Sequence, residues 1–319
     1  MMKGMVLLAL AVASGVLVAG LFPPYGFAAG AWVCLVPLLV ALWVVRGKRA
    51  GLKGFCIGWL GGVVSCLIQF RWLAEVSTLG AVLLPLYLAL FWGAFGACAA
   101  TWGNPWRGPE RRGSMEVVTV SLGRAVCLAA VWAGLELLRG WLFTGFGWNG
   151  LGVAFHETPV MAQAADLLGV TGLSMVPVFF QAVLVQAAQR LVLSARDGKR
   201  RTRLDFAIGA LLVGLLVCYG IARMAFEGRG ESVRLKALLV QLNIPQEAAR
   251  QLWDAVTIHM GYEDETIGAL KEIEAENAQR FQDAVSESDE GEVSLRWPDW
   301  VLWPETALTG RILRAEDGS

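Results

Sequence analysis

Glu305 is the acidic residue best placed for catalysis in this sequence, because it follows a short apolar segment that ends in Trp303 and Pro304. The segment 300–303 is typical of a buried strand, and α/β sheets usually bind ligands at the carboxyl ends of their strands. A carboxylate partly withdrawn from water there is suited to act as a general base. An ordinary loop glutamate after a strand has the same sequence pattern, so both interpretations stay open at this point.

Glu136 and Arg139 form a second chemically notable pair, one helical turn apart near the end of an apolar stretch. Ionisable side chains in a membrane segment are costly unless they have partners. The two charges therefore either neutralise each other or contact lipid headgroups, and the sequence favours both roles equally.

Cysteine and histidine give no pattern suited to a metal or a disulfide. All six cysteines fall within apolar stretches, where small apolar residues pack between helices. They are Cys34, Cys56, Cys66, Cys98, Cys127 and Cys218. His156 and His259 are far apart and have no ligand spacing around them. We therefore predict no metal site and no cofactor from these residues.

The charge of the chain is divided sharply along its length. The 319 residues carry 27 basic and 27 acidic side chains. Residues 1–226 hold 18 basic and 8 acidic residues, whereas residues 227–319 hold 9 basic and 19 acidic residues. This division excludes a single soluble domain, a disordered chain and a nucleic-acid binder with a general basic surface. It predicts a membrane domain over residues 1–226, followed by a water-soluble domain over residues 227–319.

Seven apolar stretches in the first domain are candidate membrane-spanning helices. A spanning helix needs about 20 mainly apolar residues, and unpaired backbone groups are excluded from lipid. The stretches cover residues 4–21, 30–45, 54–70, 79–102, 125–143, 168–193 and 204–222. The first could also be read as a cleaved signal peptide, but its removal would break the alternation of charge described next.

Basic residues predict the orientation of these spans. The connections 46–53, 103–124 and 194–203 carry 13 Lys and Arg residues, while the connections between them carry Arg71 and Arg139. The positive-inside rule places the basic connections and the N-terminus in the cytoplasm, and the acidic domain on the outer side. The outer connections 21–27 and 144–165 are rich in aromatic and glycine residues, which favours an interfacial aromatic belt or a close approach to a ligand.

The acidic domain begins as an α/β structure. Residues 233–243 predict a strand that becomes buried, residues 247–285 predict a helix, and residues 300–303 predict a second strand. Two strands in about 90 residues do not enclose a layered core. We therefore expect a fragment of a larger domain that exposes an apolar patch and has poor stability.

Six motifs in order give the chain a strong resemblance to the apolipoprotein N-acyltransferases, bacterial inner-membrane enzymes whose exported domain has the nitrilase (carbon–nitrogen hydrolase) fold. The motifs are Phe22-Pro23-Pro24-Tyr25, Glu136-x-x-Arg139-Gly140-Trp141, Thr144-Gly145-Phe146-x-Trp148, Gln163-x-x-Asp166-x-x-Gly169-x-x-Gly172-Leu173-Ser174, Val240-Gln241-x-Asn243-Ile244-Pro245-Gln246 and Trp303-Pro304-Glu305-Thr306-Ala307. The resemblance implies a multi-pass helical membrane domain followed by the start of an α/β nitrilase-like αββα sandwich.

The resemblance also implies a reaction. A Glu-Lys-Cys triad would transfer an acyl chain from a phospholipid, through a thioester, to the α-amino group of a diacylglyceryl-modified apolipoprotein. Glu305 matches the general base, and Arg139 and Trp148 match lipid-side positions. Trp253 takes the place of a tryptophan that follows Asn-Ile-Pro-Gln in the family, at a longer spacing here. The protein would act as a monomer with membrane lipid and without a cofactor, a metal or nucleic acid.

The sequence departs from the family pattern in three ways. Gly147 stands where the family usually has proline, and the segment between Gln246 and Trp297 is longer and more acidic. No cysteine follows Cys218, and the lysines after residue 226 are Lys236 and Lys271. We therefore expect an inactive N-terminal fragment. Two alternatives remain, a truncated lipid- or lipoprotein-binding protein and a transporter or sensor. The coding sequence after Ser319 would distinguish a fragment from a natural truncation.

Overall fold

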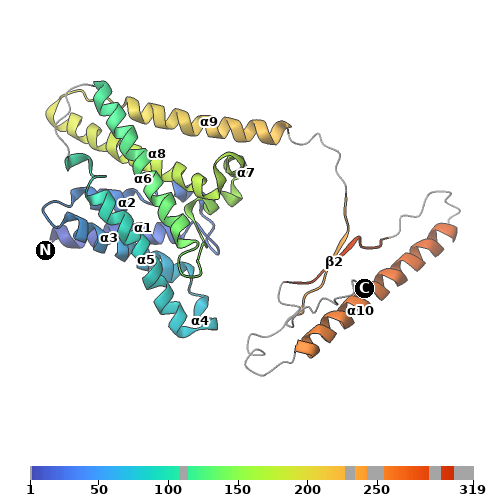
Figure 1. The fold of residues 1–319 in the computed structure, drawn as a ribbon. Helices are drawn as coiled ribbons and strands as arrows, with labels where there is room; N and C mark the ends of the chain where they lie inside the picture. Colours follow the sequence, from blue (N-terminus) through green and yellow to red (C-terminus); the bar gives the residue numbers. More distant parts are fainter. Residues whose placement is uncertain (1, 108–113, 227–233, 243–254, 287–295, 305–319) are drawn as a thin grey trace, which may run out of the picture. The chain divides into compact units, whose positions relative to one another are not determined.

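The computed structural model describes residues 2–107, 114–226, 234–242, 255–286 and 296–304. The chain divides into two compact units, Met1–Arg229 and Gly230–Ser319, which are described separately below (Figure 1).

The first unit is a helical membrane domain. Its α-helices are α1 (Met2–Ala19), α2 (Val36–Val44), α3 (Ala50–Gln69), α4 (Leu73–Val76), α5 (Thr78–Ala100), α6 (Ser114–Arg139), α7 (Pro159–Ala162), α8 (Ala165–Asp197) and α9 (Leu204–Phe226), with 3-10 helices η1 (Ala28–Trp32), η2 (Pro105–Arg107) and η3 (Leu151–Glu157). Among the described residues, α3, α5, α6, α8 and α9 are long and apolar enough to cross a membrane. Each of the seven predicted apolar stretches contains a helix, but the first two helices are shorter.

The second apolar stretch is a broken helix rather than a continuous span. The helical part, α2, has nine residues and is about 14 Å long at about 1.5 Å per residue. Pro37 in the first turn of α2 has no backbone N–H to satisfy, as is common at a helix start, whereas the amides of Leu35 and Leu38 need acceptors from elsewhere in the fold. The Gln181 side chain accepts a hydrogen bond from Leu35 N (2.6 Å), and Ser14 Oγ accepts one from Leu38 N (2.8 Å). These two polar side chains therefore replace the missing helical partners.

Helices α3 and α5 pack closely against each other in the membrane domain. Gly54, Gly58 and Gly62 lie four residues apart on α3, so they share one face of the helix. A Cβ added at Gly58 would overlap the carbonyl oxygen of Trp92, and one added at Gly62 would lie 2.7 Å from the Trp92 Cβ. Small residues on this face let the two backbones touch, which is a common way for helices to associate in membranes.

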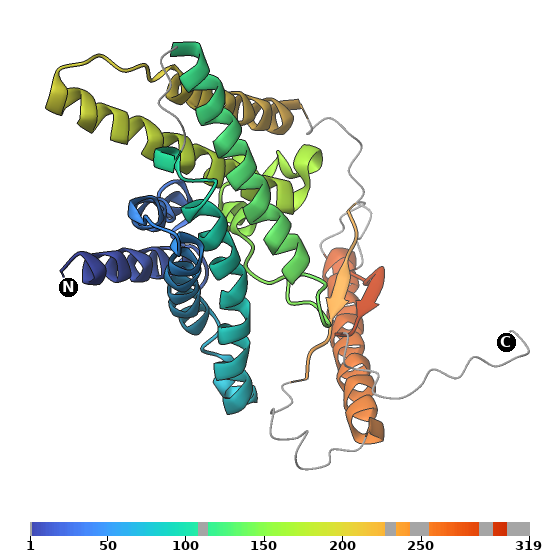
Figure 2. The same cartoon turned by 60° about the vertical axis from the view of Figure 1, so that its left-hand side comes forward.

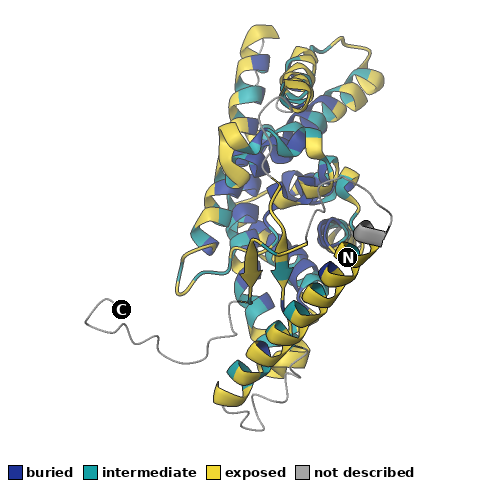
Figure 3. Ribbon diagram, turned by 90° about the vertical axis from the view of Figure 1, so that its right-hand side faces the viewer, coloured by how far each residue is buried: buried dark blue, intermediate teal, exposed yellow. Residues whose placement is uncertain are grey.

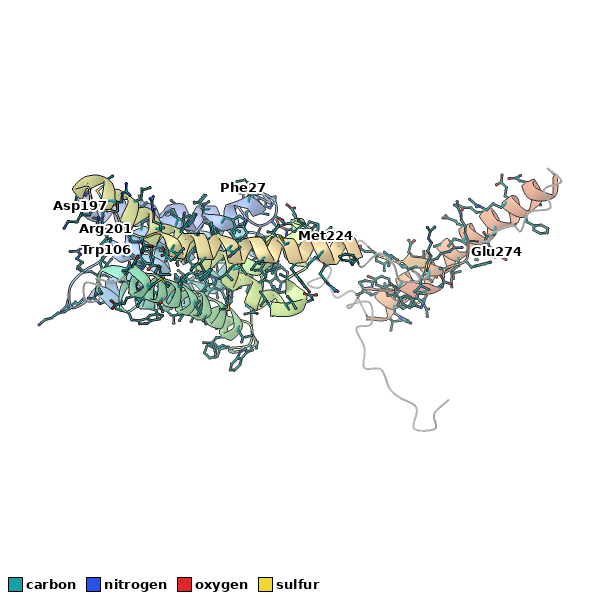
Figure 4. All side chains as sticks on the ribbon, turned by 90° about the horizontal axis from the view of Figure 1, so that it is seen from above. Phe27, Trp106, Asp197, Arg201, Met224 and Glu274 are labelled. Atoms are coloured by element: carbon teal, nitrogen blue, oxygen red, sulfur yellow. The ribbon has the colours of Figure 1, made fainter. Side chains whose placement is uncertain are left out.

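The helix bundle has two chemically distinct ends. Residues 45–49, 101–107 and 198–203 form the basic end, where Trp106, Asp197 and Arg201 gather in Figure 4. Residues 20–27, 70–77 and 140–164 form the aromatic end, which is held together by contacts between these segments.

Acidic side chains anchor α9 towards both of its ends. At the basic end the fully buried Asp205 carboxylate accepts hydrogen bonds from Ser121 of α6 and Arg190 of α8. Towards the aromatic end, Tyr219 donates a hydrogen bond to Asp166 Oδ2 (2.7 Å), and Arg223 Nε lies 3.2 Å from the same oxygen. Asp166 sits on a short first turn of α8, because the backbone at Gly169 is non-helical (φ 66°).

The second unit contains two parallel strands and one long helix. Strand β1 (Ala237–Leu239) pairs with β2 (Trp300–Leu302), Leu238 lying opposite Val301. Helix α10 (Ala255–Ser286) runs alongside them in Figure 2. Predicted and observed elements agree in kind and order, although the strands are shorter and residues 243–254 lie outside the described ranges.

A small apolar cluster joins α10 to the strands. Tyr262 of α10 is 2% exposed and packs with Val240, near Leu238 and Trp303. Most of α10 is exposed in Figure 3, as are all three residues of β2. Within the described residues of the second unit, the strands pack against α10, and the exposed apolar patch expected from the sequence stays a prediction.

Replacement of Gly58 with leucine should destabilise the membrane domain, because the new side chain meets the α5 backbone. Overpacking of this kind costs about 1–3 kcal/mol or more. The expected result is a lower unfolding temperature in detergent, followed by tryptophan fluorescence. Gly123→Leu on α6 is the control, since a Cβ there meets nothing within 4 Å. Equal destabilisation by both substitutions would contradict the close contact.

Candidate functional site

The aromatic end contains an irregular loop that begins where α6 ends. The chain reverses after Arg139, whose carbonyl accepts a hydrogen bond from Phe146 N (2.9 Å). Gly145 lies directly against the Gly140 carbonyl and has φ +78°, so only glycine fits there without strain. This turn brings residues 146–151, here called the outer loop, back over the end of the bundle.

Three helix side chains hold the outer loop. Arg139 Nη2 donates a hydrogen bond to the carbonyl of Trp148 (2.9 Å). Gln69 Oε1 accepts one from the Asn149 side chain (3.0 Å). Glu136 Oε1 accepts one from the backbone N–H of Leu151 (2.8 Å). Because an irregular backbone at membrane depth needs internal partners, these bonds let the loop lie against the helices.

Glu136 and Arg139 each bind the outer loop, and no ion pair joins them among the described residues. Glu136 Oε1 also accepts a hydrogen bond from the Trp132 indole (2.8 Å). Arg139 is only 7% exposed, and its Nε is buried without a hydrogen-bond partner. Direct neutralisation is therefore not how this pair is accommodated. Arg139 contacts Trp148 through its hydrogen bond to the backbone carbonyl of that residue.

A small cavity lies next to this polar cluster. It has a volume of about 30 Å³, which is room for roughly two water molecules. Its lining residues come from α1, α3, α5, α6 and the outer loop, and they include Cys66, Gln69, Glu136, Arg139 and Asn149. The mixture of a carboxylate, a guanidinium and two amides suits a group that both donates and accepts hydrogen bonds.

Aromatic rings stack on the exposed side of the outer loop. The Trp148 ring stacks on both Trp72 and Phe146, with ring centroids 5.5 Å and 5.9 Å away and interplanar angles of 29° and 22°. Phe146 also meets the edge of the buried Phe70 at 5.0 Å. We call Trp72, Phe146 and Trp148 the aromatic plate. Trp148 is 57% exposed, so its ring is available to a molecule outside the protein.

The two remaining predicted site residues, Glu305 and Trp253, lie outside the described residues. The last described segment before Glu305 is well held, because Trp303 Nε1 donates to Thr266 Oγ1 (3.0 Å) and the Trp303 ring stacks on Tyr262 (5.6 Å). No group of three His, Cys, Asp or Glu side chains that could hold a metal is found within the described ranges.

Sequence reasoning did not single out Gln69 or Trp72 as site residues. Gln69 is polar at the last position of an apolar helix, and Trp72 follows it in the next connection. Both signals are common at membrane interfaces. The contacts with Asn149 and Trp148, about 80 residues later in the sequence, appear only in the folded chain.

Comparison with known proteins identifies the family. Residues 14–183, which contain the polar cluster and the aromatic plate, match the family described as the apolipoprotein N-acyltransferase N-terminal domain. The chain belongs to the apolipoprotein N-acyltransferase family. Proteins named apolipoprotein N-acyltransferase resemble almost its whole length. The one from Allorhizobium ampelinum is 30% identical over 94% of this chain and 51% of the relative. Those from Geobacter metallireducens and Agrobacterium fabrum are each 28% identical, over 93% and 96% of this chain.

The chain spans about half the length of these acyltransferase relatives, which it covers to 51%, 50% and 52%. Family membership and a helical membrane domain are therefore established, while catalysis by this chain is a matter for proposal.

Replacement of Glu136 with alanine should release the outer loop. The substitution leaves the Leu151 amide and the Trp132 indole without their acceptor, at a cost of about 1–3 kcal/mol for each donor. Hydrogen exchange of peptides covering residues 148–153 should then be about tenfold faster or more. Glu157→Ala is the control, because that carboxylate is 53% exposed. Unchanged exchange in the Glu136 variant would show that the carboxylate does not hold the loop.

Proposed function

We propose that this chain is part of an N-acyltransferase that moves an acyl chain from a membrane phospholipid to the α-amino group of the lipidated N-terminal cysteine of apolipoproteins. The observation that carries the proposal is the family match over residues 14–183, extended by relatives named apolipoprotein N-acyltransferase over more than nine-tenths of the chain. The membrane domain and the exposed aromatic rings at one of its ends are consistent with an acyl donor that resides in the bilayer.

The chemistry proposed is a two-step transfer through a Glu-Lys-Cys triad. In the first step Glu305 accepts the thiol proton, the sulfur bonds to the acyl carbon, and the ester C–O bond breaks as Glu305 passes that proton to the departing glyceryl oxygen, which releases a lysophospholipid. The lysine stabilises the oxyanion that forms. In the second step the amine nitrogen attacks the thioester and gives up a proton to Glu305, the C–S bond breaks, and an amide forms as this proton passes to the sulfur.

Several residues of this chain have roles in the proposed reaction. Glu305 is the general base, and the contacts of Trp303 with Thr266 and Tyr262 support a fixed position for the segment leading to it. Trp148 presents its exposed ring to phospholipid. Arg139 positions that ring through a hydrogen bond to the backbone carbonyl of Trp148. Trp253 would contact substrate, a role that rests on the family motif alone. No cysteine follows Cys218, and the two lysines after Phe226, Lys236 and Lys271, both precede Glu305, whereas the resemblance implies a triad lysine and cysteine after it.

The proposed location is the bacterial inner membrane. The basic end would face the cytoplasm, and the second unit would lie on the outer side with the apolipoprotein. The protein would work as a monomer and without a metal or cofactor. The distribution of basic residues, concentrated in the connections 46–53, 103–124 and 194–203, supports this orientation.

The chain of 319 residues alone should not transfer acyl groups, because the proposed nucleophile is not among its residues. The purified chain in detergent would be mixed with phospholipid and a diacylglyceryl peptide, and the N-acylated peptide would be measured by mass spectrometry. The Agrobacterium fabrum relative is the positive control. Transfer at a comparable rate would overturn the assignment of the nucleophile.

A chimera tests the function directly. Residues 1–319 joined to the remaining half of the Allorhizobium ampelinum relative should transfer acyl groups. Glu305→Gln in this chimera should lower the rate about 100-fold or more, as expected for loss of a general base. Glu276→Gln on the exposed face of α10 is the control and should keep the rate. A chimera that folds but gives no product, or a Glu305 variant that is fully active, would contradict the proposal.

A further inference from the structure

The side chains of strand β2 do not by themselves select its register against β1. Residues 300–303 are all apolar, so a slip by one residue would exchange one apolar side chain for another on each face. The ladder is also short, with three residue pairs. Each residue of slip moves the end of the strand by about 3.3 Å. Contacts outside these pairs must therefore fix the position from which the chain continues towards Glu305.

Asp299 supplies one such contact at the start of β2. Its Oδ2 accepts a hydrogen bond from Lys236 N (2.7 Å), and its own N–H donates one to the Lys236 carbonyl (2.7 Å). Glu305 follows six residues later in the sequence. A single fixed point at the beginning of a short strand leaves its far end free to fray and twist, so the end needs support of its own.

Helix α10 binds the chain on both sides of β2. The Asn277 side chain is 4% exposed, and its Oδ1 accepts a hydrogen bond from Arg296 N (2.7 Å), before the strand. Thr266 Oγ1 accepts one from Trp303 Nε1 (3.0 Å), directly after it. The two α10 residues are 11 positions apart, which is about three helical turns, so they lie on the same face of the helix. This face therefore holds both flanks of β2.

The contact at Trp303 also fixes the orientation of its side chain. The Thr266 hydroxyl donates a hydrogen bond to the Tyr262 carbonyl (2.6 Å), which directs its lone pairs to the indole. An indole has a single N–H, so one acceptor sets its direction. The ring also stacks on Tyr262 (5.6 Å, 30°) and meets the His259 ring nearly edge-on (5.5 Å, 73°). Pro304, whose φ is fixed by its ring, comes next.

We propose that Thr266 and Asn277 are positioning residues for the general base. They hold β2 in one register and so determine where Glu305 stands relative to the reacting thiol. This inference rests on the proposed function, since it takes Glu305 as the base. A displacement of about 1 Å at a reacting group can cost about 100-fold in rate. Loss of either contact should therefore lower kcat, while the KM for phospholipid changes little.

The first test uses the chimera of residues 1–319 with the remaining half of the Allorhizobium ampelinum relative. Thr266→Val keeps the shape of the side chain but removes the hydroxyl, and it should lower kcat about tenfold or more with the KM for phospholipid within twofold. Thr266→Ser restores the hydroxyl and should recover most of the rate. Thr257→Val, at an exposed position of the same helix, is the control and should keep the rate. An unchanged kcat in Thr266→Val would overturn the role of Thr266.

Asn277→Ala tests the other flank independently. It should lower kcat as Thr266→Val does, whereas Gln279→Ala, on the exposed side of α10, should not. The amplitude of the acyl-enzyme burst counts the competent molecules, so kcat is expressed for each folded enzyme. A smaller burst with an unchanged kcat would assign Thr266 and Asn277 to stability alone and contradict the positioning role.

Hydrogen exchange in the 319-residue chain tests the same contacts without catalysis. Val240 N donates to the Leu302 carbonyl (3.1 Å), so peptides covering residues 237–242 and 298–304 report on the ladder. Thr266→Val and Asn277→Ala should each raise their exchange about tenfold, and Thr257→Val should not. Unchanged exchange in both variants would show that α10 does not hold β2.

The two proposals fail in different ways. If the unsubstituted chimera folds but transfers nothing, the proposed function is wrong, and the exchange measurements still decide whether α10 fixes the register. If the chimera transfers acyl groups and both variants keep its kcat, the function stands and the positioning role is wrong.

Discussion

The need to pair every backbone N–H and C=O inside the protein is the constraint on which this membrane domain depends. Most of the chain meets it with regular helices. Two of the places in the described ranges where it does not are the passage from η1 to α2 and the outer loop. In both, polar side chains of helices supply partners for backbone groups. Gln181 and Ser14 accept hydrogen bonds from backbone amides at the first place. At the second, Glu136 accepts a hydrogen bond from an amide and Arg139 donates one to a carbonyl, while Gln69 bonds the Asn149 side chain. Part of the polar content of the apolar helices is thus explained by the irregular segments that it accommodates.

The organisation of the fold could be predicted because it follows from local patterns. Apolar stretches of about 20 residues predict helices in lipid, and a strand, a helix and a strand follow in the second unit as expected. The break before α2 was not predicted, because Pro37 alone does not distinguish a helix start from a kink. The break is stabilised by the hydrogen bond from Leu35 N to the Gln181 side chain, about 145 residues later in the sequence. A short segment of the sequence does not contain both residues.

The candidate site could be predicted only in part, for the same reason. Glu136 and Arg139 stood out because charges are rare in membrane segments. Their partners could not be recognised, since the Trp148 carbonyl and the Leu151 amide are backbone groups that every residue type shares. Gln69 and Trp72 are ordinary residues for a helix end at an interface. Glu305 and Trp253, identified by family motifs, lie outside the described residues, so their arrangement still rests on the sequence.

The anchoring of α9 has a consequence for the surrounding lipid. Asp205 and Tyr219 are joined to α6 or α8 at opposite ends of this helix, and the helix between them is about 21 Å long at about 1.5 Å per residue. The hydrocarbon core of a typical bilayer is about 30 Å thick. The distance between the two anchors is therefore shorter than the hydrocarbon thickness, so a bilayer of typical thickness covers at least one of them, and the protein partners take the place of water there.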